Sequence, residues 1–316
     1  MKPTPLVSVL MPTYNVSEFV EEAVDSILKQ TYKNIEFVIV DDCSIDGTYE
    51  KLQLLAKSDP RIKLYRNPKN LKIAETLNFA LSKANGEYIA RMDGDDISLP
   101  DRISKQIDFL IENKHIDLVG LNVIVINEEG QEVKRLKFSA STENVKKLVE
   151  YFSPVPHFWV AKTETYNKVG NYRIATVEDY DFLLRMASMN LKFCNLQEYL
   201  YKQRIRQGNT ITASGLIQRK YVEYIHKLYK ERVASGLKTD SYTEEQLEDY
   251  KKIGKLEKYF FDLSNKYMYN FSLFVQSNKL RALYNLFFML LFSPIHQGRY
   301  FFRKYKYNKI LKNEFE

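Results

Sequence analysis

The sequence predicts an α/β fold, in which a mostly parallel sheet is flanked by helices and followed by a helical C-terminal region. The apolar run at residues 6–11 and the mostly apolar segment at residues 35–40 are typical of parallel strands that are buried on both faces. A segment with helical periodicity follows each run, and such alternation implies parallel strands joined by right-handed crossovers. The alternation stops after Thr212, so we expect one α/β domain and then a region of a different kind.

Each expected element follows from its hydrophobic pattern. Apolar pairs between residues 19 and 28 recur at helical spacing and predict a helix with one face on the core. The expected order is a strand at 6–11, a helix at 19–28, a strand at 35–40, a helix through 55, a strand at 62–65, a helix at 73–84, a strand at 88–92, strands at 118–127 and 133–138, and a helix at 143–151.

Three carboxylates crowd the end of the fourth strand. Asp93, Asp95 and Asp96 lie within four residues, and like charges this close repel each other unless a cation is bound. Mg²⁺ and Mn²⁺ take one or two carboxylates together with substrate phosphate oxygens. The alternative is a solvated acidic loop. Ser98 and Asp101 are expected to start the next helix as a capping box.

The second strand also ends in acidic residues, Asp41 and Asp42, before a polar turn and a helix. Such a turn could simply cap the helix. It could also bind a nucleotide, since a ribose or uracil edge needs carboxylate acceptors and a diphosphate favours a helix N-terminus. The turn after the first strand, residues 12–15, contains no glycine, which argues against a dinucleotide-binding dehydrogenase.

Together, four segments resemble the family 2 glycosyltransferases of the GT-A fold over roughly residues 5–212. The segments are residues 12–15, 41–48, 90–96 and 178–181. The resemblance implies an inverting transferase that uses a nucleotide-sugar, usually a UDP-sugar, and a divalent Mn or Mg cation. It implies a GT-A catalytic domain at 1–212, with a nucleotide-sugar half at about 1–100 and an acceptor half at about 101–212, followed by a helical region at 213–316.

The resemblance carries nucleotide-binding roles to five residues. Thr13, Tyr14 and Asn15 would lie along the nucleotide. Asp42 would contact the uracil or ribose, with Asp41 behind it.

The same resemblance assigns the metal and the base. Asp93 and Asp95 would form the DxD pair, with Asp95 the direct metal ligand, and Asp179 would be the catalytic base. A direct displacement needs a base on the face opposite the leaving diphosphate. Acidic residues at a helix N-terminus are favourable in any protein, so charge–dipole complementarity is the alternative explanation of Asp179.

Two positions depart from the family pattern. Cys43 stands where glycine is usual, and we expect it to be tolerated if the backbone there is not left-handed. Arg206 stands where many relatives carry a histidine. Arginine cannot ligate a metal, but its guanidinium can bind diphosphate oxygens; the alternative is a surface arginine.

Candidates for the acceptor side lie in the middle of the chain. His157 and Trp159 follow two prolines in residues 153–159, and aromatic rings in such loops can stack on sugar faces. Glu178, beside the expected base, is a third candidate. The alternative for Trp159 is a place in the hydrophobic core.

The C-terminal region is helical, aromatic and basic. Helices are expected at 214–233, 243–263 and 279–292, and residues 251–316 hold 13 basic, 4 acidic and 17 Phe or Tyr residues. Two helix faces are expected, one apolar and one basic: Leu280, Leu283, Tyr284, Phe287 and Leu291, and Arg299, Arg303 and Lys306. Basic and aromatic residues together suit an anionic membrane surface. Packing, a homodimer or nucleic acid are alternatives, although no nucleic-acid motif is present.

Composition places the chain in a reducing compartment, because Cys43 and Cys194 are far apart and lack metal spacing. The first residues lack an apolar signal, and the longest apolar run, 286–292, is too short to span a bilayer. We therefore expect a cytoplasmic enzyme, peripheral on the inner membrane face, that transfers sugar to a glycan or lipid-linked acceptor in surface polysaccharide synthesis. A sugar-nucleotide nucleotidyltransferase and a catalytically silent nucleotide-binding or scaffold subunit are the alternatives.

Overall fold

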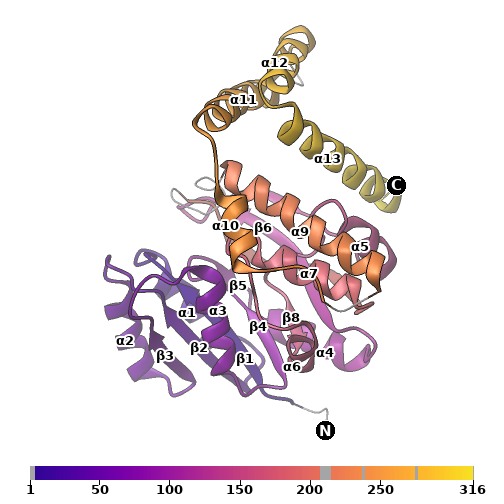
Figure 1. Cartoon of the computed structure of the whole chain (residues 1–316). Helices are drawn as coiled ribbons and strands as arrows, with labels where there is room; N and C mark the ends of the chain where they lie inside the picture. The colour runs from indigo at the N-terminus through magenta and orange to yellow at the C-terminus, as the bar shows by residue number, and fades with distance from the viewer. Residues whose placement is uncertain (1–3, 207–214, 237–238, 275–276, 316) are drawn as a thin grey trace. The chain divides into compact units, whose positions relative to one another are not determined.

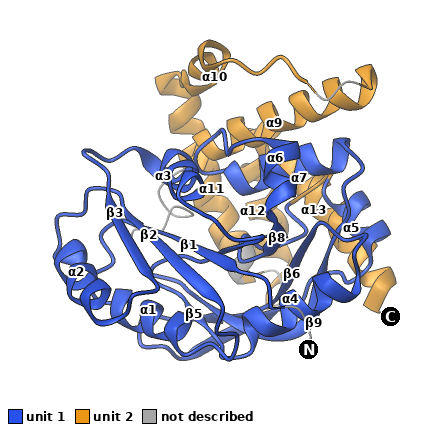
Figure 2. Ribbon diagram, turned by 90° about the horizontal axis from the view of Figure 1, so that it is seen from below, with its two compact units in different colours: residues 1–149, 153–209 blue, residues 150–152, 210–316 orange. Residues whose placement is uncertain are grey.

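The computed structural model describes residues 4–206, 215–236, 239–274 and 277–315. The chain divides into two compact units, coloured separately in Figure 2. Unit 1 comprises residues 1–149 and 153–209, and unit 2 comprises residues 150–152 and 210–316. Three residues of unit 2 therefore come from the middle of the chain.

Unit 1 is built on a mixed sheet with the strand order β3-β2-β1-β4-β8-β6-β9-β5, with β7 paired to β6. The strands, visible in Figure 1, are β1 (Val7–Thr13), β2 (Ile35–Asp41), β3 (Ile62–Arg66), β4 (Tyr88–Arg91), β5 (Ile97–Ser98), β6 (Leu118–Ile126), β7 (Glu132–Leu136), β8 (Val160–Lys162) and β9 (Phe193–Arg204). The predicted α/β class with a mostly parallel sheet and a helical C-terminal region is confirmed.

The four strands predicted from the first half are parallel neighbours, and this fixes where the site forms. β1 pairs with both β2 and β4, and β2 pairs with β3, all in parallel. Thr13 is in register with Asp41, and Asp41 with Arg66. The carboxyl ends of these strands consequently meet at one edge, where open α/β sheets bind ligands. β8 and β5 add antiparallel pairings farther along.

Helices cover both faces of this sheet, which explains why every residue of β1 and β2 is buried. Figure 2 shows α1 (Val20–Leu28), α2 (Thr48–Ser58) and α4 (Arg102–Glu112) along one face, and α3 (Lys72–Ser82), α6 (Thr163–Val169) and α7 (Glu178–Ser188) along the other. The remaining helix of unit 1 is α5 (Thr142–Leu148).

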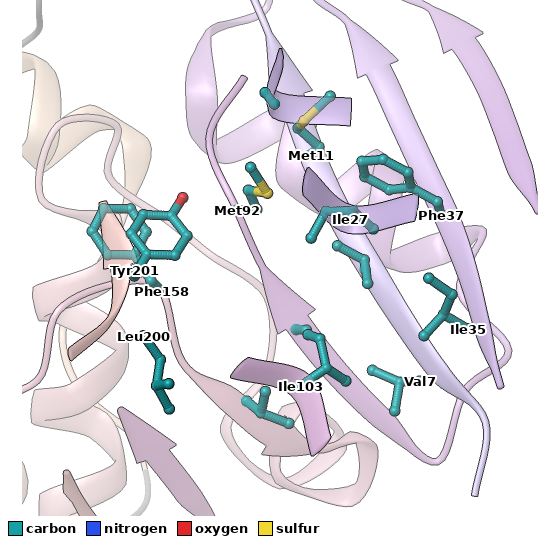
Figure 3. Packing of buried hydrophobic residues seen from close by; sticks show 14 of the residues in the cluster. Val7, Met11, Ile27, Ile35, Phe37, Met92, Ile103, Phe158, Leu200 and Tyr201 are labelled. Carbon is teal, nitrogen blue, oxygen red and sulfur yellow. The ribbon is translucent and has the colours of Figure 1, made fainter. Parts of the chain in front are cut away.

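The hydrophobic core extends to the site. In Figure 3 the rings of Phe158 and Tyr201 lie face to face, beside Met92; the ring centroids are 3.9 Å apart. Phe158 directly follows His157, and Met92 directly precedes Asp93. Two candidate site residues are therefore flanked by residues fixed in the core, which keeps their backbones in place.

The predicted capping box at the start of α4 is wrong. The helix does begin near Asp101, but the Asp101 side chain makes no capping hydrogen bond. Ser98 belongs to β5, and its hydroxyl accepts a hydrogen bond from Gln30 Nε2 at 3.1 Å. The Ile103 amide, near the start of α4, donates to Gln30 Oε1 at 3.0 Å. The buried side chain of Gln30, distant in sequence, thus accepts the hydrogen bond at the start of α4 that the Ser98 and Asp101 pair was expected to accept.

Unit 2 contains α9 (Gly215–Ser235), α10 (Glu244–Lys251), α11 (Lys255–Phe274), α12 (Lys279–Phe292) and α13 (Pro294–Phe315). The single helix predicted at 243–263 is wrong, because the helical hydrogen bonding stops at 252–254 and separates α10 from α11. Phe152 packs edge-on against Tyr300 and Tyr307, with ring centroids 5.6 and 5.7 Å apart. None of the helices in the described ranges combines the length and apolarity needed to cross a bilayer.

Candidate active site

Strained backbone marks the carboxyl edge of the sheet. Five described residues other than glycine have a positive φ, and four of them are predicted site residues or lie within two residues or one hydrogen bond of them: Asn15, Cys43, Lys72 and Thr176. Each such conformation costs of the order of 1–3 kcal/mol and persists only where the surrounding structure imposes it. Strain of this kind clusters at functional sites, so this edge is the candidate active site.

The two neighbouring aspartates after β2 have different surroundings. Asp41 is fully buried and accepts a hydrogen bond from the Ser44 amide at 3.0 Å, so it shapes the turn before α2. Asp42 accepts from Asn67 Nδ2 and Leu71 N at 2.8 Å and from Lys72 N at 2.9 Å. A carboxylate can accept about four hydrogen bonds, so about one position remains for a ligand.

The residues after β1 are tied to the same turn. Thr13 is buried, whereas the Tyr14 side chain is 44 % exposed. The Asn15 amide donates to Ser44 Oγ, and the Asn15 side-chain oxygen accepts from Ile45 N, both at 3.0 Å. The turns after β1 and β2 are thereby held together, with Tyr14 at the surface beside them.

The condition under which Cys43 was expected to be tolerated is not met. Its φ is 63°, which is the left-handed region that favours glycine. An L-residue costs about 1–2 kcal/mol there. Cys43 therefore occupies a strained turn beside Asp42.

The three carboxylates after β4 have separate partners. Asp93 Oδ2 lies 2.9 Å from His157 Nε2, and Asp95 Oδ2 lies 2.7 Å from Arg206 Nε. Asp96 is buried and accepts hydrogen bonds from the Tyr201 hydroxyl at 3.0 Å and the Arg204 amide at 2.7 Å. Asp96 thus anchors β9, while Asp93 and Asp95 interact with His157 and Arg206 at the carboxyl edge of the sheet.

Burial and the charged neighbours at this edge shift the pKa values of these carboxyl groups in opposite directions. Burial would raise the pKa of Asp93, but His157, Arg91 and Arg102 outweigh it and lower that pKa to about 2. Burial and the neighbouring Asp93 raise the pKa of Asp95. Burial, with Asp95 and Asp93, raises the pKa of Asp96 well above its usual range. An additional cation at this edge would relieve that repulsion.

Asp93 and Asp95 fit a divalent cation whose remaining ligands are phosphate oxygens of the substrate. Asp93 Oδ1 is shielded from solvent and accepts no hydrogen bond, and Asp95 is held by an arginine. In the described part of the chain no cluster of three or more His, Cys, Asp or Glu side chains has metal-binding geometry. Mg²⁺ commonly binds through one or two carboxylates plus phosphates, so Asp93 and Asp95 would need the phosphates of a bound donor to complete such a site.

Asp179 stands apart from its acidic neighbours in α7. Its side chain is 24 % exposed, and its Oδ2 lies 3.8 Å from His157 Nδ1. Glu178 is buried in an ion pair with Arg91, and Asp181 is buried between Arg173 and Arg185. Of the three carboxylates at this helix start, Asp179 is the one whose side chain is accessible to solvent.

His157 connects the two halves of the site. One ring nitrogen faces Asp93, and the other faces Asp179. The structure thus brings three candidates together, although Asp93 lies 64 residues before His157 in the sequence. Residues 207–214 of the segment that follows Arg206 lie outside the described residues.

Two acceptor candidates are buried in the structure. The Trp159 side chain has no exposed surface, and its Nε1 donates to the Tyr166 hydroxyl at 3.0 Å, which matches the core alternative. Glu178 Oε1 lies 3.0 Å from the Arg91 guanidinium. Neither side chain has a free face for an acceptor, because each is committed to an interior partner.

Sequence reasoning overlooked Arg91. This arginine is 3 % exposed, contacts Glu178 and lies 3.8 Å from Asp93 Oδ1 through its Nε. Arg102 holds the same strand end, donating to the Arg91 carbonyl at 2.6 Å and the Phe158 carbonyl at 3.1 Å. An arginine inside an apolar strand, two residues before an aspartate, was the available signal.

Comparisons with known proteins identify relatives of this chain. Residues 8–181 match the model of Glycosyl transferase family 2. The chain is 38 % identical over 210 residues to the EpsE protein of Bacillus subtilis, covering 65 % of this chain and 74 % of EpsE. It is 31 % identical over 215 residues to the O-antigen biosynthesis glycosyltransferase WbnJ of Escherichia coli, covering 65 % of this chain and 82 % of WbnJ.

Solved structures share the fold. S. aureus TarS 1–349 with UDP-GlcNAc has a TM-score of 0.59 at 19 % identity, covering 96 % of this chain and 88 % of that one. The mannosyltransferase PcManGT of Pyrobaculum calidifontis, with GDP-Man and Mn²⁺, has a TM-score of 0.56 at 18 % identity, covering 99 % and 88 %. At this identity the likeness concerns the fold.

Proposed function

This chain belongs to glycosyl transferase family 2, and from that membership we propose that it transfers a sugar with inversion from a UDP-sugar to a glycan or lipid-linked acceptor. The placement of His157 between Asp93 and Asp179 carries the proposal. It leaves the carboxylate assigned to the donor on one side of the histidine ring and the carboxylate assigned as the base on the other. The O-antigen role of WbnJ supports a place in cell-surface polysaccharide synthesis.

The donor is assigned to the carboxyl edge of the parallel strands. Tyr14, Asn15 and Asp42 bind the nucleoside in this proposal, with Thr13 and Asp41 holding the turns beneath them. TarS is a structural neighbour with UDP-GlcNAc bound, which supports a UDP-sugar. Arg206, already beside Asp95, supplies positive charge for the diphosphate.

The chemistry is a single displacement. Asp179 takes the proton of the acceptor hydroxyl as that oxygen attacks the anomeric carbon, and the bond to the diphosphate oxygen breaks on the opposite face. The proton ends on the Asp179 carboxylate. His157 hydrogen-bonds to Asp93 through Nε2 and lies 3.8 Å from Asp179 through Nδ1, so it positions the Asp93 side chain beside the base.

A divalent cation, Mn²⁺ or Mg²⁺, belongs to this proposal. Asp93 and Asp95 would hold it, together with the donor phosphates. When bound, it supplies the charge that neutralises the leaving diphosphate. PcManGT, another neighbour in fold, is described with GDP-Man and Mn²⁺, which supports the assignment.

We also assign the enzyme to the cytoplasmic face of the membrane as a peripheral protein. The basic and aromatic C-terminal region supports this location. A lipid-linked acceptor would be presented at the same surface.

The function is tested by turnover of a panel of nucleotide-sugars, with and without a chelator. Asp179→Asn should lower the transfer rate by about 10²–10⁴, the usual contribution of general-base assistance, and leave nucleotide affinity nearly unchanged. Asp95→Ala should remove metal-dependent binding, measured by calorimetry. Asp101→Asn, an exposed aspartate without a capping bond, is the control.

The results can contradict each part separately. Full transfer by Asp179→Asn would place the base elsewhere. Equal nucleotide affinity and activity in chelator and in Mn²⁺ would remove the cation from the mechanism. No turnover of any nucleotide-sugar by the wild type would favour a catalytically silent subunit.

A further inference from the structure

Helix α12 presents a continuous apolar face to the surroundings. Its predicted apolar residues are all more than half exposed, with fractions of 56–81 %. We call this set the α12 apolar face: Leu280, Leu283, Tyr284, Phe287 and Leu291. Proteins rarely leave contiguous apolar patches uncovered, and such a patch indicates an interaction site.

The opposite side of α12 is already used. Ala282, Asn285 and Met289 are buried, and the carbonyl of Met289 accepts a hydrogen bond from Ser264 Oγ of α11 at 2.8 Å. Helix α12 is thus held by α11 through one side, while the α12 apolar face stays more than half exposed; its Tyr284 ring also lies near α11, with its centroid 6.4 Å from that of the Tyr267 ring. The face is therefore available without unfolding of the helix pair.

Charge identifies the occupant. Helix α12 contains Lys279 and Arg281 and no acidic residue, and residues 279–315 together hold eight basic residues and one acidic residue. In α13 the exposed rings of Phe302 and Tyr305 alternate with basic side chains, and Lys306 Nζ lies 5.6 Å from the Phe302 ring centroid. A second copy of this chain would bring like charges together, whereas anionic lipids neutralise them.

The basic face predicted on α13 is only partly outward. Arg299 forms an ion pair with Glu223 of α9 at 2.8 Å. Arg303 is only partly exposed and lies close enough to His226 of α9 to lower the pKa of that histidine. Charge reversal at Arg299 and Arg303 would therefore disturb the packing of unit 2, and Lys306 and Lys309 are better probes.

We propose that the α12 apolar face docks the enzyme on an anionic lipid surface, with the exposed side of α13 adding basic and aromatic contacts. The apolar side chains of an interfacial helix enter the boundary between head groups and acyl chains by about 5–10 Å, while basic side chains stay at the head groups. This deepens the proposed peripheral location by naming the surface, and it rests on exposure and charge rather than on sugar transfer.

The test is flotation of the full chain with vesicles of phosphatidylcholine alone or mixed with phosphatidylglycerol. The wild type should bind the mixed vesicles, more weakly at high salt, and bind the neutral ones at least tenfold less. Leu283→Gln with Phe287→Gln should lower binding to mixed vesicles at least tenfold. Burial of each apolar side chain in the membrane contributes a factor of about ten or more to the binding constant, and each substitution removes it. Lys306→Gln with Lys309→Gln should also lower it, and salt should matter less.

A matched control separates position from hydrophobicity. Leu54→Gln with Val133→Gln removes two apolar side chains that are 67 % and 56 % exposed in unit 1, and it should leave binding unchanged. The substituted positions are exposed, except Lys306, which is partly exposed, and circular dichroism checks that each variant is folded. Hydrolysis of the donor, measured without vesicles, should be unchanged by the α12 substitutions, so a failed docking surface and a failed catalytic proposal give different results.

Three outcomes would overturn the proposal. The first is no binding of the folded wild type to mixed vesicles. The second is binding that the α12 substitutions leave intact. The third is sedimentation in which the α12 substitutions convert a dimer to a monomer while lipid binding stays the same, which would make this face a contact between copies.

Discussion

The buried ion pair of Arg91 and Glu178 makes a sharp prediction for Glu178→Gln. The two side chains are 3 % and 6 % exposed, and their closest atoms are 3.0 Å apart. Glu178→Gln leaves the guanidinium buried, with Asp93 at 3.8 Å as its remaining carboxylate. Removing one partner of a buried pair costs about 3–5 kcal/mol. Glutamine keeps an oxygen that can accept from Arg91, so we expect about 3 kcal/mol.

The assay is thermal unfolding of the full chain followed by circular dichroism. At about 2–4 °C per kcal/mol for a domain of this size, the melting temperature of unit 1 should fall by about 6–12 °C. Arg91→Met should cost a similar amount, because it strands the carboxylate. The double variant Arg91→Met with Glu178→Met should recover most of the loss, because a hydrophobic replacement of a whole buried pair is often neutral.

The control is a surface pair. Lys168 and Glu164 are 3.7 Å apart with side chains 51 % and 58 % exposed, so Glu164→Gln should change stability by less than about 1 kcal/mol. Additive losses in the Arg91 and Glu178 double variant would refute the coupling. Because Asp179 follows Glu178 at the start of α7, Glu178→Gln should also lower kcat more than it changes donor KM.

Three further predictions concern stability. Cys43→Gly should stabilise unit 1 by up to about 1 kcal/mol in urea unfolding, because it relieves the left-handed backbone; destabilisation would contradict this. Gly86→Ala should destabilise by about 1–3 kcal/mol, since its methyl would lie 2.5 Å from the Ser8 amide nitrogen. Burial, with Arg303 and Lys230 outweighing Glu223, lowers the pKa of His226 to about 3, so the folded state disfavours its charged form. Stability of unit 2 should therefore fall below pH 6.5, by about 2 kcal/mol at pH 5, and His226→Asn, unlike His115→Asn at an exposed site, should reduce that fall.

The parallel half of the sheet could be predicted because each of its strands is a run of apolar residues followed by a helix. The ends of β1, β2 and β4 then have to meet, so the sequence alone predicts that Asn15, Asp42 and Asp93 lie at one edge. The short strands β5 and β8 were missed. Two and three residues give no periodicity, and their pairing with β9 and β4 depends on distant chain.

The partners of the site residues could not be predicted. Arg206 and Asp95 are 111 residues apart, and Arg91 and Glu178 are 87 apart, so no local pattern relates them. Sequence spacing identified the carboxylates but could not show which of them form ion pairs with arginine. The distinction between Asp179 and its buried neighbours Glu178 and Asp181 required their ion pairs to be seen.

Residues 150–152 restrict how this protein can be divided or recombined. Phe152 is encoded between α5 and the loop of His157, yet its ring packs on Tyr300 and Tyr307 of α13. A gene fragment that stops at residue 209 would produce a catalytic unit with an unpaired phenylalanine at its surface. Exchange of the C-terminal region between relatives must carry position 152 with it, so the two stretches of gene are expected to change together during evolution.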